Sequence, residues 1–182
     1  LSLALTGVPA EWVVLPQPVY LMPGAQEEVV ITIRPPRTPS SLAGKRTMGL
    51  SAKRKDADTA LTTQQVVLTI REYAQLALTI EPERQRSDES AEYLVRVSNE
   101  GNSILDVKLS AQDEKNECEF VIDTPDISLS AGTTHTAQLG VRRRATAGID
   151  AERTYAFSVD VQSIGSPDVR ATQRAEWTCN PP

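Results

Sequence analysis

The sequence contains few of the residues on which most enzymes and metal centres depend. Its 182 residues include one histidine, two cysteines, two tryptophans, four tyrosines and two phenylalanines. A zinc site usually needs four ligands from histidine, cysteine and carboxylate side chains, and a serine or cysteine nucleophile usually needs a nearby imidazole. The chain also has no Gly-x-Ser-x-Gly elbow, phosphate-binding glycine loop or His-Glu-x-x-His motif. We therefore expect no catalytic residues, no cofactor and no resident metal.

Long apolar runs and a broad basic patch are missing as well. No apolar stretch approaches the roughly 20 residues of a membrane-spanning helix, so we expect no direct membrane insertion. The formal net charge is −5 and the pI is about 5.0, which argues against a nucleic-acid partner. With 40% hydrophobic and 24% charged residues, the composition is that of a globular protein.

The amino terminus lacks the basic segment, apolar stretch and cleavage site of a secretory signal. Residues 1–5 alternate as a strand does, and no initiating methionine precedes them. We therefore expect this chain to be a piece of a longer protein. The other domains of that protein would be its partners, and its targeting signal would lie elsewhere.

What the sequence does contain is a recurring alternation of apolar and polar residues. Apolar side chains fall at every second position over 29–33, 93–97 and 155–161. This period places one side of each strand in a core and the other in solvent. Turn-forming residues such as Pro23–Gly24 and Asn99–Asn102 separate the runs. No window has the periodicity of an amphipathic helix, so the pattern predicts an all-β sandwich.

The chain also repeats itself, which predicts two tandem domains, 1–75 and 76–182. Core positions correspond to core positions, and turns correspond to turns. The matched segments are Leu1–Leu5 with Leu105–Leu109, Trp12–Val14 with Phe120–Ile122, Leu21–Gly24 with Leu129–Gly132, Ile33–Arg34 with Val141–Arg142, Arg46–Ser51 with Arg153–Ser158, and Ile70 with Trp177.

The second copy has two strands, about 76–80 and 91–98, for which the first copy has no counterpart; residues 81–90 are predicted as the turn between them. Without these strands, the strand predicted over 29–33 in the first copy would be an apolar edge, which proteins normally protect. Either the missing strands lie outside this chain, or other chains cover the edge by exchanging or adding a strand. In the second case Val29, Ile31 and Ile33 would carry a strand-swapped or edge-paired oligomer.

The order of turns and core residues resembles that of a known family. Gly7–Trp12 is followed by Leu21–Gly24, then by Arg34–Pro36, then by Ala43–Gly44. This order is similar to that of the bacterial immunoglobulin-like modules that accompany secreted α-galactosidases, and to that of the CARDB-like repeats of proteins related to cell adhesion. The resemblance implies two tandem immunoglobulin-like β-sandwiches, the first lacking its two N-terminal strands. It also implies an extracellular or cell-envelope location.

The second copy follows the same family pattern with two departures. It keeps Asn99–Asn102 and Leu129–Gly132, but it has Phe120 where the pattern has tryptophan and Arg143–Arg144 where the pattern has two prolines. Because the shared motifs are turns and core positions, they specify the fold far more than the function.

Cys118 and Cys179 both fall in the second copy. In an immunoglobulin-like topology both would lie towards the same end of the sandwich, where a disulfide would suit an exported protein. A bridge requires Cα atoms within about 7 Å. The alternative is two unpaired cysteines.

The remaining polar clusters favour solvated structural roles. His135 is expected at a solvated strand end, and none of the acidic pairs has the spacing of a calcium-binding loop. Residues 1–75 have eight basic and six acidic residues (net +2), and residues 76–182 have eleven and eighteen (net −7). This asymmetry either orients a partner or serves solubility. The clusters are Asp56 with Asp58, Glu114 with Glu117, Asp123 with Asp126, Lys53–Lys55 and Arg142–Arg144.

Two functions fit these observations. The first is a non-catalytic spacer or adhesion-type interaction module of a larger exported bacterial protein, with a protein or a glycan as partner. The alternative is a carbohydrate-binding accessory module of a secreted hydrolase, which needs exposed aromatic rings. Tyr20, Tyr73 and Trp177 are the candidates for that role, because Trp12 and Phe120 are predicted to fill the cores.

Overall fold

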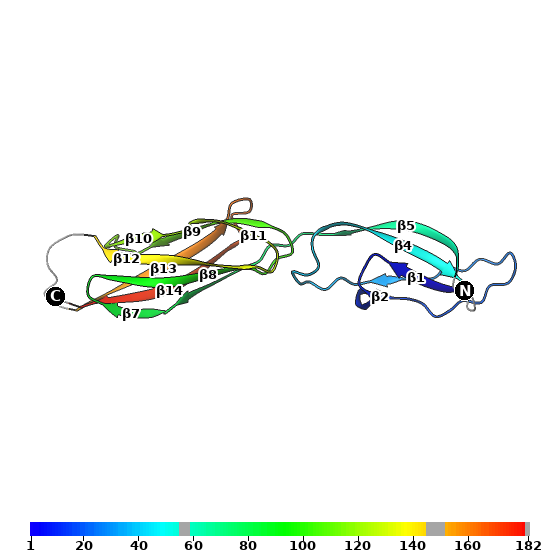
Figure 1. The fold of residues 1–182 in the computed structure, drawn as a ribbon, viewed down its shortest axis with the longest axis horizontal. Coiled ribbons are helices and arrows are strands. Elements are labelled where there is room, and N and C mark those ends of the chain that lie inside the picture. Colours follow the sequence, from blue (N-terminus) through cyan, green and yellow to red (C-terminus); the bar gives the residue numbers. More distant parts are fainter. Residues whose placement is uncertain (55–58, 145–151, 181–182) are drawn as a thin grey trace. The chain divides into compact units, whose positions relative to one another are not determined.

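The computed structural model describes residues 1–54, 59–144 and 152–180. The chain divides into two compact units, Leu1–Glu72 (unit 1) and Tyr73–Pro182 (unit 2). Apart from the short 3₁₀ turn η1 (Ala10–Trp12), the regular structure of the described residues is entirely β-strand (Figure 1). The predicted all-β, immunoglobulin-like fold class is confirmed.

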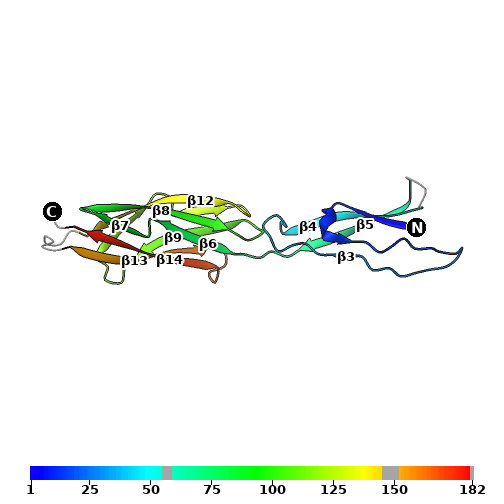
Figure 2. The ribbon, with the colours of Figure 1, turned by 90° about the horizontal axis from the view of Figure 1, so that it is seen from below.

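Unit 2 is a sandwich of two sheets. One sheet has the strand order β10-β12-β8-β6, and the other has the order β11-β9-β13-β14-β7. All neighbours are antiparallel except β7 and β14, which are parallel (Figures 1 and 2). The strands are β6 (Leu76–Glu81), β7 (Arg84–Ser87), β8 (Ser90–Asn99), β9 (Leu105–Gln112), β10 (Cys118–Ile122), β11 (Asp126–Leu129), β12 (Thr134–Arg143), β13 (Arg153–Ser163) and β14 (Arg170–Cys179).

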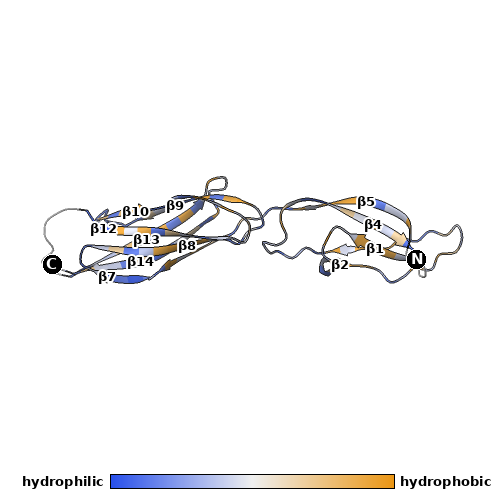
Figure 3. Cartoon of the chain, in the orientation of Figure 1, coloured by the Kyte–Doolittle hydropathy of each residue, from blue (hydrophilic) through white to orange (hydrophobic). Residues whose placement is uncertain are grey.

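Alternating burial along the central strands builds the core of unit 2. In β8 the buried residues alternate with exposed or partly buried ones, and β13 repeats the pattern from Tyr155 to Val161. Figure 3 shows the hydropathy along these strands. Burial of apolar surface contributes about 25 cal/mol per Å², and aromatic contacts add to it. Phe157 lies at the centre of these contacts, with ring centroids 5.2 Å from Tyr93 and 5.4 Å from Phe120.

The segment 81–90, predicted as a turn, contains the strand β7, so that part of the prediction is wrong. β7 has the sequence Arg-Gln-Arg-Ser and no apolar residue, and it lies at the edge of its sheet beside β14. Charged side chains are common on edge strands because they discourage pairing with other chains. The polar sequence that hides the strand from a hydrophobic pattern is therefore suited to its position.

The turn that follows β8 is held by the buried side chain of Asn99. Its Nδ2 donates to the carbonyl oxygens of Ser103 (2.8 Å) and Leu129 (3.0 Å), and its Oδ1 accepts from the backbone N–H of Gly101 (2.9 Å). Asn99 thereby satisfies backbone groups from two separate segments, which would otherwise be buried without partners.

The same turn forms hydrogen bonds with Tyr73, the first residue of unit 2. Asn102 Oδ1 accepts from the backbone N–H of Tyr73 (2.8 Å), and the Asn102 N–H donates to the Tyr73 carbonyl (3.2 Å). A Cβ atom on Gly101 would lie 2.5 Å from that carbonyl oxygen, so only glycine fits there. These contacts explain the Asn-x-Gly-Asn sequence at 99–102.

Unit 1 has a three-stranded sheet in the order β1-β4-β5 and a two-stranded ladder, β2-β3. The same order occurs in unit 2 as β9-β13-β14 and β10-β12. Within residues 1–54 and 59–72, no strand holds the places that β6 and β8 hold in unit 2. The strands are β1 (Ser2–Thr6), β2 (Val13–Val14), β3 (Thr32–Ile33), β4 (Gly44–Lys53) and β5 (Ala60–Ile70).

The strand registers correct one part of the predicted repeat. If the outer strands correspond as predicted, Leu50 matches Val161 rather than Phe157, a shift of four residues. A shift by an even number keeps the same residues on the same face, so the hydrophobic pattern alone cannot detect it. The registers are Leu5 with Leu50, Leu109 with Val161, Gly44 with Ile70, and Tyr155 with Trp177.

Candidate interaction surface of unit 1

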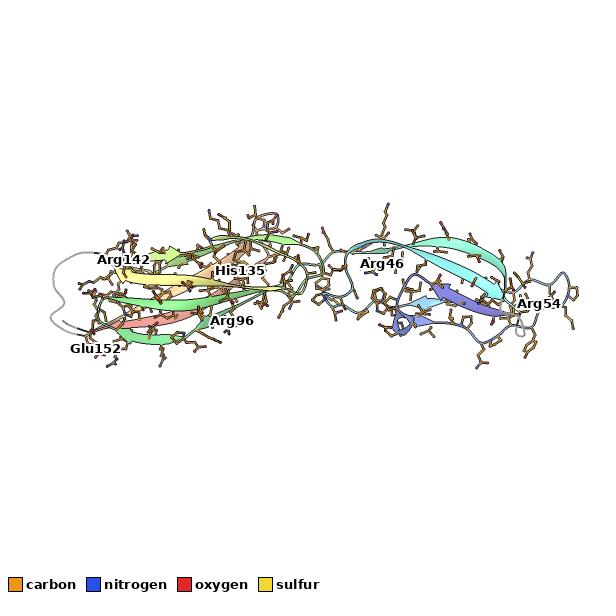
Figure 4. The ribbon with its side chains drawn as sticks, in the orientation of Figure 1. Arg46, Arg54, Arg96, His135, Arg142 and Glu152 are labelled. Carbon is orange, nitrogen blue, oxygen red and sulfur yellow. The ribbon has the colours of Figure 1, made fainter. Side chains whose placement is uncertain are left out.

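The core of unit 1 is small. Trp12 (4% exposed) and Met48 (2% exposed) are its buried hydrophobic side chains among the residues described. The guanidinium carbon of Arg46 lies 5.4 Å from the centre of the Trp12 ring (Figure 4 labels Arg46 on β4). The prediction that Trp12 fills the core is confirmed, and in unit 2 Phe120 also packs against the core.

Much of the inner face of the β1-β4-β5 sheet is left partly open. Met48 pairs with Val66, and paired residues of antiparallel strands share a face. Val66 is nevertheless 39% exposed, and Leu68 and Ile70 on the same face of β5 are only partly buried. We call Val66, Leu68 and Ile70 the open face.

Unit 2 shows what covers this position in a complete sandwich. Its corresponding strand β14 lies against β6 of the opposite sheet. There Ala175 and Trp177, the counterparts of Leu68 and Ile70, are 2% and 0% exposed, whereas Gln173, the counterpart of Val66, is partly buried. Since no strand takes the place of β6 in the described part of unit 1, the open face keeps its contact with solvent.

The outer edge of β3 is open as well. In unit 2, β12 has β10 on one side and β8 on the other, whereas in the described part of the chain β3 pairs with β2 alone. The predicted strand over 29–33 is accordingly reduced to Thr32–Ile33, and that prediction of its length is wrong. A residue is assigned to a strand when it forms backbone hydrogen bonds with a neighbouring strand. The residues just before Thr32 have no such neighbour among the residues that the structure describes. We call residues 28–34 the open edge.

The backbone of the open edge has a defined orientation. The N–H of Arg34 donates to the carbonyl of Trp12 at 2.7 Å, and Thr32 pairs with Val14. Since successive residues of a strand direct their backbone groups to opposite sides, those of Ile33 face away from β2, and the same alternation continued upstream would direct those of Ile31 away as well. The side chains of Val29, Ile31 and Ile33 are partly buried, whereas Val30 is 76% exposed.

The aromatic residues considered for sugar binding are distributed differently from the prediction. Trp177 is fully buried: its ring stacks on Tyr155 with centroids 5.4 Å apart, and its Nε1 donates to Ser87 Oγ at 2.9 Å. Tyr73 is partly buried, and Tyr20 is 81% exposed. The expectation that Trp177 is an exposed candidate is wrong. The sequence does indicate that Trp177 is buried, because Ala175, Trp177 and Cys179 alternate with polar residues and so lie on one face of the strand.

Both cysteines lie in the core of unit 2, and both have free thiols in the structure. Cys118 is on β10 and Cys179 on β14, so they belong to opposite sheets. Burial raises the pKa of the Cys118 thiol to about 12, and the carboxylates of Asp113 and Glu117 act in the same direction. Burial also raises the pKa of Cys179, whose Sγ donates to the Asp88 carbonyl. The disulfide stays a prediction.

Several members of the charged clusters have structural partners. Asp123 Oδ1 accepts from the Gln138 N–H at 2.9 Å. Arg142 pairs with Glu119 at 2.9 Å, and Arg153 pairs with Glu117 at 2.6 Å (Figure 4 labels Arg142). The pair Asp56 and Asp58, and Lys55 of the basic cluster Lys53–Lys55, lie outside the described residues. Across residues 1–54, 59–144 and 152–180, no group of three or more metal-ligating side chains occurs.

His135 lies near a strand end, as expected, but its ring is less solvated than predicted. Its ring is partly buried near the start of β12, and its Nε2 is buried with no hydrogen-bond partner among the described atoms (Figure 4). An open groove of about 670 Å³ lies elsewhere in unit 2, lined by residues that include Glu114, Glu117, Arg153 and Asp160. Its lining mixes both charge signs and contains no histidine or cysteine.

Comparison with known proteins gives general likenesses only. No protein-family model matches the sequence, and no curated protein matches it. PapD-like domain 7 of human CEP192 aligns over 58% of this chain and 84% of its own, at 12% identity and a TM-score of 0.38. The Escherichia coli chaperone DraB aligns over 59% and 56%, at 16% identity and a TM-score of 0.40.

The cadherin-like domains 1 to 4 of zebrafish RET align over 99% of this chain and 41% of their own, at 12% identity and a TM-score of 0.38. The aligned region is thus less than two thirds of DraB and of the RET fragment. At these TM-scores the likenesses identify no family. No helix among the described residues is long and apolar enough to span a membrane.

Proposed function

We propose that this chain is a non-catalytic interaction module of a larger protein, made of two tandem immunoglobulin-like domains, 1–75 and 76–182. In this proposal unit 2 is the complete scaffold, and unit 1 is the binding domain that lacks its first two strands. The observation that carries it is the shared strand order of the two units, combined with the uncovered face and edge of unit 1. Exposed apolar surface of this kind commonly marks sites of protein association.

The location and the nature of the partner form part of the proposal. The resemblance to bacterial modules of secreted α-galactosidases and CARDB-like repeats supports an extracellular or cell-envelope location. A protein partner fits better than a glycan, because Tyr20 is the one well-exposed ring among the three aromatic candidates. A disulfide between Cys118 and Cys179 would suit the same location.

A solvatochromic dye tests whether the open face is accessible. The full chain is expected to enhance the fluorescence of anilinonaphthalene sulfonate, a dye that binds exposed apolar surface. Val66→Ser should reduce that enhancement, since Val66 is the most exposed residue of the open face. The matched control is Ile104→Ser, which removes a comparable side chain, 68% exposed, from a loop of unit 2.

The dye experiment has two results that would contradict the proposal. One is the absence of fluorescence enhancement in the folded chain. The other is an equal loss of fluorescence in the Val66→Ser and Ile104→Ser variants, which would mean that the open face is not a distinct surface. Circular dichroism of both variants confirms that the strands are retained.

A further inference from the structure

We propose that the open edge of unit 1 pairs with the open edge of a second copy of this chain, about a two-fold axis through Ile31. The inference rests on the proposed function, because it names a partner for the uncovered part of unit 1. A two-fold axis perpendicular to a sheet makes the two edge strands antiparallel, and their backbone groups then satisfy one another.

The backbone orientation of the open edge permits this pairing. The N–H and C=O groups of Ile33 face away from β2. If pairing extends the strand upstream, the same alternation places those of Ile31 and Val29 on that side too. In an antiparallel pair centred on Ile31, the two copies of Ile31 are opposite, and each Val29 is opposite an Ile33. All of these are positions at which both residues present their hydrogen-bonding groups to the partner. The ladder with β2 is left unchanged.

The charges at the ends of the open edge favour the same register. Glu28 lies three residues before Ile31, and Arg34 lies three residues after it. Antiparallel pairing about Ile31 therefore places each Glu28 opposite the Arg34 of the other copy. Both side chains are exposed, and this pair falls at a non-hydrogen-bonded position, where side chains approach most closely.

Other registers lose this match. A shift by two residues in either direction places Glu28 opposite Thr32 or Pro36, and neither carries a charge. The five residues between Glu28 and Arg34 are Val-Val-Ile-Thr-Ile, all β-branched and strongly favoured in strands. The segment is thus self-complementary in hydrogen bonding and charge, which favours a second copy as its partner.

Charge reversal tests the pairing in the full chain. Sedimentation velocity is expected to show a concentration-dependent equilibrium between monomer and dimer. Each single variant, Glu28→Arg or Arg34→Glu, replaces two attractive pairs per dimer with two repulsive ones and should raise the dimer Kd about tenfold. The double variant Glu28→Arg/Arg34→Glu restores both pairs and should recover the original Kd.

Glu27→Arg is the matched control. It makes the same change of charge at the neighbouring exposed residue, which in this register faces Pro35 of the second copy, so the Kd should change little. Three results would overturn the inference: a chain that stays monomeric up to its solubility limit, a dimer whose Kd is unchanged by the charge reversals, or open-ended oligomers.

A fourth overturning result concerns a different occupant. A chain extended upstream of Leu1 could stay monomeric while the amides of the open edge are protected from hydrogen exchange. In that case strands of the added segment pair with the open edge in place of a second copy. The dye experiment on Val66 is independent of all these outcomes, so failure of the dimer is distinguishable from failure of the proposed function.

Discussion

Replacing Trp177 with alanine is expected to lower the free energy of unfolding of unit 2 by about 3–5 kcal/mol, the range measured for buried aromatic residues. The ring is fully buried, stacks on Tyr155 and donates a hydrogen bond to Ser87. The substitution therefore leaves a cavity between the sheets and a hydroxyl without its donor. A loss of this size is a large part of the roughly 5–15 kcal/mol that stabilises a typical domain.

Urea-induced unfolding of the full chain, followed by far-UV circular dichroism, measures the effect. Tyr20→Ala is the matched control, because that ring is 81% exposed and its removal should change the free energy by less than about 0.5 kcal/mol. If Trp177→Ala lowered the free energy of unfolding no more than Tyr20→Ala does, Trp177 would not be in the core. The sugar-binding alternative would then regain one of its aromatic candidates.

The second large effect is expected at Asn99. Asn99→Ala removes two donated hydrogen bonds and one accepted one, so the N–H of Gly101 and the carbonyls of Ser103 and Leu129 lose a partner. Each buried polar group without a partner costs about 1–3 kcal/mol, and we expect a total loss of about 3 kcal/mol. The same urea titration measures it.

Asn99→Asp separates hydrogen bonding from packing. The carboxylate that this substitution introduces would still accept from Gly101, but it cannot donate to the two carbonyls and would repel them. The variant should therefore be less stable than the original at neutral pH and should recover part of the difference as the pH falls and the carboxyl becomes protonated. Gln75→Ala is the control beside the same turn, since it removes only the exposed contact with Glu100. A variant Asn99→Ala that matched this control would refute the role of Asn99.

The sequence predicted the strands whose burial alternates, and the structure has them. β8, β9, β12 and β13 each place an apolar side chain in the core at alternate positions over most of their length. For such strands the local pattern and the tertiary environment demand the same thing, because one face is buried. The turn at Asn99–Asn102 was also predictable, since its residue types are those that turns require.

The features that were not predicted depend on neighbours distant in sequence. β7 has no apolar pattern of its own and forms because β14 lies beside it. The β-branched residues 29–33 predict a strand of five residues, but β3 contains only two of them, because no strand like β8 flanks it in the described part of unit 1. Trp177 was misassigned although the alternation of Ala175, Trp177 and Cys179 marks a buried face, because the strand that covers this face, β6, is distant in sequence.

The candidate site was foreseeable in outline but not in detail. The repeat indicated that unit 1 lacks two strands and that Val29, Ile31 and Ile33 border the gap. The pattern could not show that β5 keeps an exposed inner face, because exposure of Val66 depends on what packs above it. Nor could it show which backbone groups of the open edge face outward. That orientation follows from the hydrogen bond between Arg34 and Trp12.

Hydrogen exchange of the full chain at low protein concentration, measured by mass spectrometry, tests the difference between the two units most directly. A complete sandwich protects its central strands up to the global stability, whereas strands with few buried contacts open locally. We predict slow exchange in β8, β9 and β13, and much faster exchange in β5 and over residues 28–34. Equal protection in the two units would mean that unit 1 is already complete, and it would contradict the interaction surface described above.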